Sequence, residues 1–187
     1  MLLRPLALAV ALVLTGAACR PGTTAGPAGD GAATVTRVVD GDTIRVRLRG
    51  VDEPVRLIGI DTPETHGRGG LRECFGEEAT RRLRAILPAG TAVRLVRDVE
   101  ARDRYDRLLA YVYRADDGLF VNLAMAEEGY ATTLTYPPNV AHTDDFVAAV
   151  AQARRRNLGL WRSCGSADVP LGAGAGPGAA GPARSSG

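Results

Sequence analysis

The sequence contains no lysine, so each of its 23 basic residues is an arginine. A guanidinium group is planar and carries five donors, which suits phosphate recognition better than an ammonium group does. The excess of basic over acidic residues is small, with a formal net charge of +2. A chain so close to neutrality does not bind nucleic acid through bulk charge. Any site for a polyanion must therefore be local and built on arginine.

Histidine is nearly absent as well, which narrows the metal chemistry that the chain can support. The only two histidines, His66 and His142, lie in predicted loops and lack the spacing typical of metal ligands. A metal site must then be sought among the carboxylates. No internal repeat is visible in the 187 residues.

No apolar stretch is long enough to cross a bilayer, which takes about 20 residues. The apolar stretch at residues 6–14 follows Arg4 and precedes small residues, so residues 1–18 are predicted to be a signal peptide. The sequence before Cys19 resembles a bacterial lipoprotein cleavage site, although Gly16 stands where leucine is usual. The expectation is an exported protein, either a cell-envelope lipoprotein lipidated at Cys19 or a secreted protein without a lipid anchor.

The number of cysteines, three, is consistent with an exported lipoprotein. If Cys19 carries lipid, Cys74 and Cys164 form an even pair, and in an oxidising compartment they are predicted to form a disulfide. The alternative is a pair of buried free thiols.

Composition also sets the domain boundaries. Residues 19–33 are rich in Gly, Ala, Pro and Thr and are predicted to be a flexible tether, and residues 166–187 a disordered tail. Residues 34–165 remain as one folded domain, expected to be a monomer.

Within this domain the strand signals come first and the helices later. The fold class predicted is α+β, mainly β: a five-stranded OB-fold barrel with three helices. The first three strands are expected to form an antiparallel meander, with turns at Asp40-Gly41 and at residues 50–53. The expected strands are 34–39, 43–48, 54–60, 91–97 and 108–113, and the expected helices are 77–87, 120–128 and 144–157.

The stretch from Val55 to Thr65 concentrates the chemistry. It begins as an apolar strand interrupted by Arg56, whose permanent charge needs a partner inside a barrel. It ends in Asp61 and Glu64, with Pro63 stiffening the backbone between them. A cation, two anions and a rigid turn at a strand end indicate a site.

A second acidic cluster lies at the first hairpin, where Asp40 and Asp42 flank Gly41. In a meander this hairpin can approach the end of the third strand. Hard oxygen ligands from both places would suit Ca²⁺ or Mg²⁺ and leave positions for water and phosphate. The alternative for Asp40-Gly41 is ordinary turn chemistry.

Arg56 and Arg107 are the candidate anion binders. Two guanidinium groups beside a metal would hold the equatorial oxygens of a phosphodiester. The alternative is that each pairs with a nearby aspartate in a structural salt bridge.

Several segments, in order along the chain, resemble the thermonuclease (staphylococcal nuclease-like) family. The resemblance covers roughly residues 34–161 and implies an OB-fold barrel with three helices. The segments that carry it are Val38–Thr43, Arg56–Thr65, Phe75–Ala79, Asp103–Tyr111, Val121-Asn122 and Leu158–Trp161.

The resemblance implies a division of labour among the acidic residues. Asp42 and Asp61 would bind Ca²⁺ through their carboxylates, and Thr62 through its backbone carbonyl. Glu64 would orient or deprotonate the attacking water.

It further implies that Arg56 and Arg107 stabilise a pentacoordinate phosphorane. In-line attack would break the 5′-O–P bond of DNA or RNA and leave 3′-phosphates. Arg104, Tyr105 and Tyr136 are candidate substrate-binding residues, with core packing as the alternative for the tyrosines. The pattern departs from the family in the less basic loop at residues 66–72 and at Leu134, which stands where a tyrosine is expected.

Two other functions fit the same fold. The first is a non-catalytic OB-fold module that binds nucleic acid, although such modules typically lack some of the carboxylates or arginines that this chain has. The second is an oligosaccharide binder, which only the fold supports.

Overall fold

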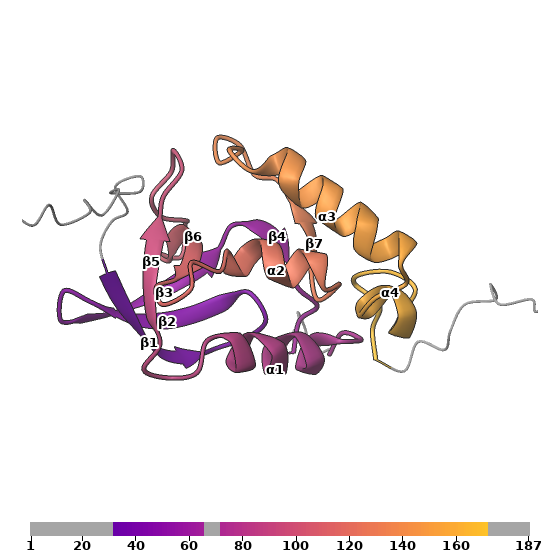
Figure 1. Cartoon of the computed structure of the whole chain (residues 1–187), viewed down its shortest axis with the longest axis horizontal. Coiled ribbons are helices and arrows are strands. Elements are labelled where there is room, and N and C mark those ends of the chain that lie inside the picture. Colours follow the sequence, from indigo (N-terminus) through magenta and orange to yellow (C-terminus); the bar gives the residue numbers. More distant parts are fainter. Residues whose placement is uncertain (1–31, 66–71, 172–187) are drawn as a thin grey trace, which may run out of the picture.

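A computed structural model describes residues 32–65 and 72–171 of the chain. The predicted signal peptide, Cys19 and nearly all of the tether lie outside the described residues. The described strands form a closed barrel in the order β1-β2-β3-β6-β5, accompanied by helices (Figure 1). The predicted α+β class with a five-stranded barrel is therefore confirmed.

The first three strands form the expected antiparallel meander: β1 (Ala32–Val38), β2 (Thr43–Leu48) and β3 (Val51–Leu57). On β2, Val46 is buried in the barrel while Arg47 is exposed, as the alternating pattern predicts. The second turn is shorter than predicted. It consists of Arg49 and Gly50, both with positive φ, because Leu48 already pairs with Val51.

The predicted third strand, 54–60, is in fact broken in two. After Leu57 the chain leaves the barrel, and β4 (Gly59–Asp61) pairs with β7 (Thr132–Leu134), a strand that the sequence did not predict. Gly59 has a φ of 84°, and a Cβ there would lie 2.1 Å from Cε2 of Phe146. Only glycine fits both requirements, and the break carries Asp61 out of the barrel wall.

The second half of the chain closes the barrel with β5 (Ala92–Val96) and β6 (Leu108–Arg114). β5 lies antiparallel between β1 and β6, whereas β3 and β6 are parallel. Where β3 departs, the buried Asn122 donates from Nδ2 to the carbonyls of Ile58 (2.9 Å) and Ala110 (3.2 Å). Its Oδ1 accepts the amide of Val112 at 2.9 Å. A side-chain amide thus satisfies backbone groups at the end of the ladder.

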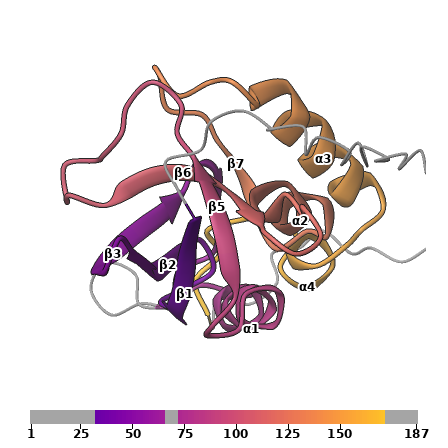
Figure 2. The same ribbon diagram turned by 60° about the vertical axis from the view of Figure 1, so that its left-hand side comes forward.

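Three helices match the predicted ones to within two residues: α1 (Gly76–Ile86), α2 (Val121–Glu127) and α3 (Thr143–Arg155). A short α4 (Leu160–Ser163) is additional. The helix α2 lies between the barrel and α3 in both views (Figures 1 and 2). Within the described ranges, no helix has the length and apolar character needed to cross a membrane.

The last described segment returns to the start of α1. Cys74 and Cys164 form a disulfide with Cα atoms 6.0 Å apart, the pairing that the cysteine count predicts. Beyond Gly165, the carbonyl of Val169 accepts the Cys74 amide at 2.7 Å, and the Leu171 amide donates to the Arg72 carbonyl at 2.7 Å. The folded chain therefore extends to residue 171, into the stretch expected to be a tail.

Candidate active site

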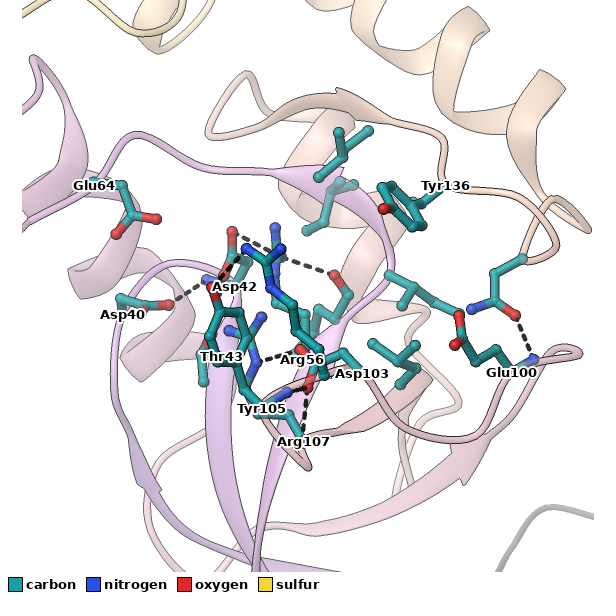
Figure 3. A pocket seen from close by; sticks show the side chains of 18 residues that line it. Asp40, Asp42, Thr43, Arg56, Glu64, Glu100, Asp103, Tyr105, Arg107 and Tyr136 are labelled. Carbon is teal, nitrogen blue, oxygen red and sulfur yellow. Dashed lines mark hydrogen bonds and ion pairs between the residues drawn. The ribbon is translucent and has the colours of Figure 1, made fainter. Parts of the chain in front are cut away.

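A cavity of about 470 Å³ opens on the outer face of the barrel, between the first hairpin, β3, and the loops that precede β6 and α3 (Figure 3). Seven of the sequence-predicted site residues line it, whereas Asp61 and Thr62 are not among the lining residues. The lining residues that matter below are Asp40, Asp42, Thr43, Arg56, Glu64, Glu100, Asp103, Arg104, Tyr105, Arg107, Leu134, Tyr136 and Asn139.

Asp42 is placed by the hairpin between β1 and β2. The side chain of Asp40 accepts the Asp42 amide at 3.1 Å, so the turn chemistry expected of Asp40 is present. A Cβ on Gly41 would lie 2.6 Å from Oγ1 of Thr62. Glycine therefore lets the hairpin approach the segment after β4, which brings the two predicted acidic clusters together.

The carboxylate of Asp42 is buried and heavily engaged. Its Oδ2 accepts both the amide and the hydroxyl of Thr62, each at 3.1 Å, and its Oδ1 accepts the Thr43 hydroxyl at 3.1 Å. Burial raises the pKa of Asp42 to about 6, against the opposing effect of the Arg56 charge. Asp42 therefore resists ionisation unless positive charge lies close by.

Arg56 supplies part of that charge from β3. Its Nη1 lies 2.8 Å from Oδ2 of Asp42, and its Nη2 lies 2.8 Å from Oδ1 of Asp61. The salt-bridge alternative for Arg56 is thus correct, and yet the same guanidinium lines the cavity. From the sequence, a structural salt bridge and anion binding are alternatives for Arg56, whereas the structure allows both.

Asp61 and Thr62 follow from the excursion of the chain into β4. Asp61 pairs with Thr132 of β7 and is half-buried. Burial raises the pKa of Asp61, Arg56 partly offsets this rise, and the Asp42 charge adds to it. Thr62 is buried and directs its amide and hydroxyl at Asp42, so the three predicted metal ligands lie together.

Glu64 lies at the edge of the cavity, on the side of Asp40 (Figure 3). Partial burial, followed by the charges of Asp42, Asp40 and Asp61, raises its pKa to about 7, against the opposing charge of Arg56. A carboxyl group with a pKa near neutrality can exchange a proton with water at that pH.

Arg107 reaches the cavity from the other side and is held by Asp103. Its Nε donates to Oδ2 of Asp103 at 2.7 Å, and its amide donates to Oδ1 at 2.9 Å. Burial raises the pKa of Asp103, but hydrogen bonds from Arg107 and Tyr105 outweigh it, and the net pKa is lowered. Within residues 32–65 and 72–171, no hydrogen bond or ion pair engages the Nη groups of Arg107.

The three predicted substrate-binding residues line the cavity. Tyr105 and Tyr136 are 64% and 72% exposed, so the core-packing alternative is wrong for both. The guanidinium of Arg104 lies 4.7 Å from the ring centroid of Tyr105. An exposed ring beside a guanidinium group is a typical platform for a stacked base. Leu134 also lines the cavity and is exposed.

Sequence reasoning missed two further lining residues, Glu100 and Asn139. The buried Asn139 accepts the Glu100 amide at 2.8 Å and donates its own amide to the Tyr136 carbonyl at 3.0 Å. It thereby fixes the loop of Tyr136, which includes a cis peptide between Pro137 and Pro138. An asparagine after two prolines reads only as a turn signal, so no pattern distinguishes this role.

The donor set fits a hard divalent cation. Asp42, Asp61 and Glu64 each have a pKa raised mainly by burial, and neighbouring carboxylates add to it: Asp40 for Asp42, Asp42 for Asp61, and all three aspartates for Glu64. Negative charge is therefore concentrated at this site. Carboxylate oxygens are the ligands that Ca²⁺ prefers. In the part of the chain that the structure describes, no three His, Cys, Asp or Glu side chains form a ready-made cluster. Water and substrate oxygens would have to complete the coordination, as the low ligand count predicts.

Comparison with known proteins finds similarity to nucleases of one family. The profile of the family described as "Staphylococcal nuclease homologue" matches residues 54–163. The chain is 39% identical over 127 residues to the thermonuclease of Staphylococcus intermedius, covering 68% of this chain and 74% of that protein. It is 35% identical over 133 residues to the endonuclease YncB of Bacillus subtilis (strain 168), covering 71% of this chain and 62% of that protein.

A third relative is longer. The chain is 36% identical over 133 residues to the SPbeta prophage-derived endonuclease YokF of Bacillus subtilis (strain 168), covering 71% of this chain but 44% of that protein. The chain therefore spans less than two thirds of either Bacillus protein and about three quarters of the thermonuclease.

Proposed function

The chain belongs to the family of staphylococcal nuclease homologues, and from this membership and the geometry of its cavity we propose that it is a calcium-dependent endonuclease acting on DNA and RNA. The relatives named thermonuclease and endonuclease support nuclease activity. The calcium requirement and the chemistry below rest on the side chains of this chain.

Asp42, Asp61 and Thr62 would hold the cation. Asp42 and Asp61 offer hard oxygen donors, and they carry a negative potential that Arg56 only partly offsets. Bound there, Ca²⁺ would neutralise an oxygen of the scissile phosphate and favour attack on phosphorus. Arg56 would remain in contact with both carboxylates and keep them in place.

Glu64 would act on the attacking water. It lies at the cavity edge, and its pKa of about 7 in the protein without metal would fall once positive charge enters the cavity. The resulting carboxylate would accept a hydrogen bond or a proton from the water and aim its oxygen at phosphorus.

Arg56 approaches the cavity from β3 and Arg107 from the loop before β6, and both can meet charge that develops on the phosphoryl oxygens. The Nη groups of Arg107 are the better candidates, because among the described residues Asp103 binds the side chain through Nε alone. In-line attack of water would break the 5′-O–P bond and leave a 3′-phosphate. Tyr105, Tyr136 and Arg104 would hold the neighbouring base and sugar.

The observation that carries the proposal is the convergence of Asp42, Glu64, Arg56 and Arg107 on one cavity, with Asp61 joined to them through its ion pair with Arg56. A barrel needs none of these charges for its core. Their joint placement at an open cavity fits metal-assisted phosphodiester hydrolysis better than simple binding.

The decisive test is hydrolysis of single-stranded DNA and RNA with Ca²⁺ and with chelator. Activity is expected only with Ca²⁺. Glu64→Gln should lower turnover by about 10²–10⁴-fold, the usual contribution of a general base. Arg81→Ala, an exposed arginine on α1 outside the cavity, is the matched control and should leave turnover unchanged. Equal hydrolysis under both conditions, or strand binding without hydrolysis in saturating Ca²⁺, would reject the proposal.

We also propose that the protein is exported and works as a monomer. The disulfide between Cys74 and Cys164 supports an oxidising compartment, where such bonds persist. The mass of the mature N-terminus separates the two forms of export: a diacylated Cys19 indicates a membrane-anchored lipoprotein, and an unmodified N-terminus a secreted protein. An intact Met1 in the mature protein would count against export.

A further inference from the structure

Glu64 lies outside any strand or helix, since β4 ends at Asp61 and α1 begins at Gly76. Its position must therefore be set by contacts with other segments. Two hydrogen bonds to Glu73 supply them. The Glu64 amide donates to Oε2 of Glu73 at 2.8 Å, and the Glu73 amide donates to the Glu64 carbonyl at 2.9 Å. Glu73 thus binds both backbone groups of Glu64.

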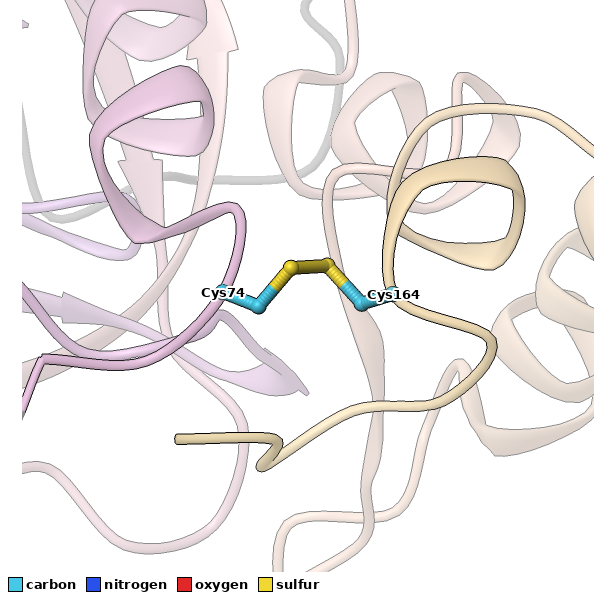
Figure 4. The surroundings of a disulfide bond; sticks show 2 residues. All are labelled: Cys74 and Cys164. Atoms are coloured by element: carbon cyan, nitrogen blue, oxygen red, sulfur yellow. A yellow bond between two sulfur atoms is a disulfide. The ribbon is translucent and has the colours of Figure 1, made fainter. Parts of the chain in front are cut away.

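Glu73 is itself held from the opposite side. The next residue, Cys74, is bonded to Cys164, and its amide donates to the Val169 carbonyl at 2.7 Å (Figure 4). Glu73 also forms a β-bridge with Pro170. The backbone around Glu73 therefore lies between the segment of Glu64 and the last described residues of the chain.

The start of α1 adds a steric limit. A Cβ on Gly76 would lie 2.8 Å from the carbonyl oxygens of both Pro63 and Glu64. The helix N-terminus is therefore in close contact with this backbone, and its buried residue Ala79 anchors it to the core. Little freedom is left for Glu64 to move toward α1.

Part of this support lies outside the residues that the family profile matches. The profile match ends at residue 163, one residue before Cys164 and six before Val169.

We propose that Glu73 is a positioning residue for Glu64, and that the Cys74–Cys164 disulfide together with residues 169–171 holds Glu73 in place. The proposal rests on the role of Glu64 under the proposed function. Because a shift of about 1 Å in a catalytic group can cost about 10²-fold in rate, fixing the Glu64 backbone matters to turnover. Substrate binding, which uses Arg104, Tyr105 and Tyr136, does not depend on this contact.

The first test compares three variants with the full-length parent in Ca²⁺. Glu73→Ala should lower kcat by about 10–10²-fold with KM unchanged, because the bond that orients Glu64 is lost. Glu73→Gln keeps an oxygen that accepts the Glu64 amide and should retain most of kcat. Glu78→Ala, which removes a partly exposed glutamate in the first turn of α1, is the control and should match the parent. A loss in Glu73→Ala that appears in KM alone would overturn the proposal.

A double variant shows whether Glu73 acts through Glu64. If it does, adding Glu73→Ala to Glu64→Gln lowers kcat no further, because the group being positioned is already inactive. Multiplicative losses would overturn the proposal. Cys164→Ser, which breaks the anchor without touching Glu73, should lower kcat in the same direction and should likewise add nothing to Glu64→Gln.

Hydrogen exchange provides a readout that needs no activity. The Glu64 amide should exchange with solvent at least 10-fold faster in Glu73→Ala than in the parent, and at the parental rate in Glu78→Ala. Unchanged exchange in a folded Glu73→Ala protein would refute the positioning role. A parent that shows no hydrolysis but loses this protection in Glu73→Ala would refute the proposed function and leave the structural contact established.

Discussion

At the scale of single residues, Arg56 shows how one side chain meets two demands. A charged group on an apolar strand requires a partner, and the structure provides two in Asp42 and Asp61. The pairs also fix both carboxylates, of which Asp42 lines the cavity. The sequence predicted the need for a partner because the charge interrupts an apolar run, but it did not predict that Asp42 and Asp61 would both be that partner.

Tyr111 gives a test of a buried polar contact away from the cavity. Its hydroxyl donates to Oδ2 of Asp98 at 3.0 Å, and the same oxygen accepts the Ala141 amide at 2.9 Å. Burial, followed by the hydrogen bond and charge of Asp98, raises the pKa of Tyr111 well above its ordinary value. The neutral phenol therefore stabilises the fold fully below the unfolded pKa of about 10, and this contribution is lost as the pH rises toward the folded pKa.

The variant Tyr111→Phe should lower the free energy of unfolding by about 0.5–1.5 kcal/mol at neutral pH. Between roughly pH 10 and 12 its stability should fall less steeply than that of the parent, because one late-ionising tyrosine is gone. Urea unfolding across that range measures both effects. The exposed Tyr136→Phe serves as control, and equal alkaline slopes in parent and Tyr111→Phe would contradict the assignment.

At the scale of elements, the sequence predicted strands and helices best where the pattern was local. The meander, α1 and the barrel strands β5 and β6 follow from alternation and from proline and glycine boundaries. The break between β3 and β4 was missed because the apolar residues Leu57, Ile58 and Ile60 read as the continuation of one strand. The partner strand β7 has only three residues and lies some 70 positions later, so its pairing depends on tertiary contacts that no local pattern contains.

Gly59→Ala tests this break. The substitution would force a Cβ onto a φ of 84° and against the Phe146 ring at 2.1 Å. We expect a loss of stability of roughly 2–4 kcal/mol, together with weaker Ca²⁺ binding because Asp61 follows on the same short strand. Thermal unfolding and calcium titration measure the two effects.

Gly90→Ala is the matched control for this variant. Gly90 has a similar φ of 92°, but nothing lies within 4 Å of the position that a Cβ would occupy. The loss of stability in Gly90→Ala therefore measures the backbone strain alone, of order 1 kcal/mol, without a steric clash. A Gly59→Ala variant no less stable than Gly90→Ala would mean that the Phe146 ring moves aside.

At the scale of the whole molecule, the sequence predicted the charged residues of the site but not most of those that hold them. Asp42, Asp61, Glu64, Arg56 and Arg107 each belong to a segment with a chemical signature. Several supporting residues carry no such signature, since they act through a partner distant in the sequence. Asn139, for example, binds the backbone of Glu100, 39 positions away. Roles of this kind become visible only once the fold brings the segments together.

The order of strands in the barrel has a consequence for the chain as it is synthesised. The first three strands form a meander that is local, but each of its outer edges pairs with the second half of the chain: Ala32 with Arg94, and Val55 with Leu108. Until residue 114 has emerged, both edges are open and able to pair with another chain. A nascent chain therefore passes through a stage when aggregation competes with folding, and a fragment that stops before β6 has no closed barrel to adopt.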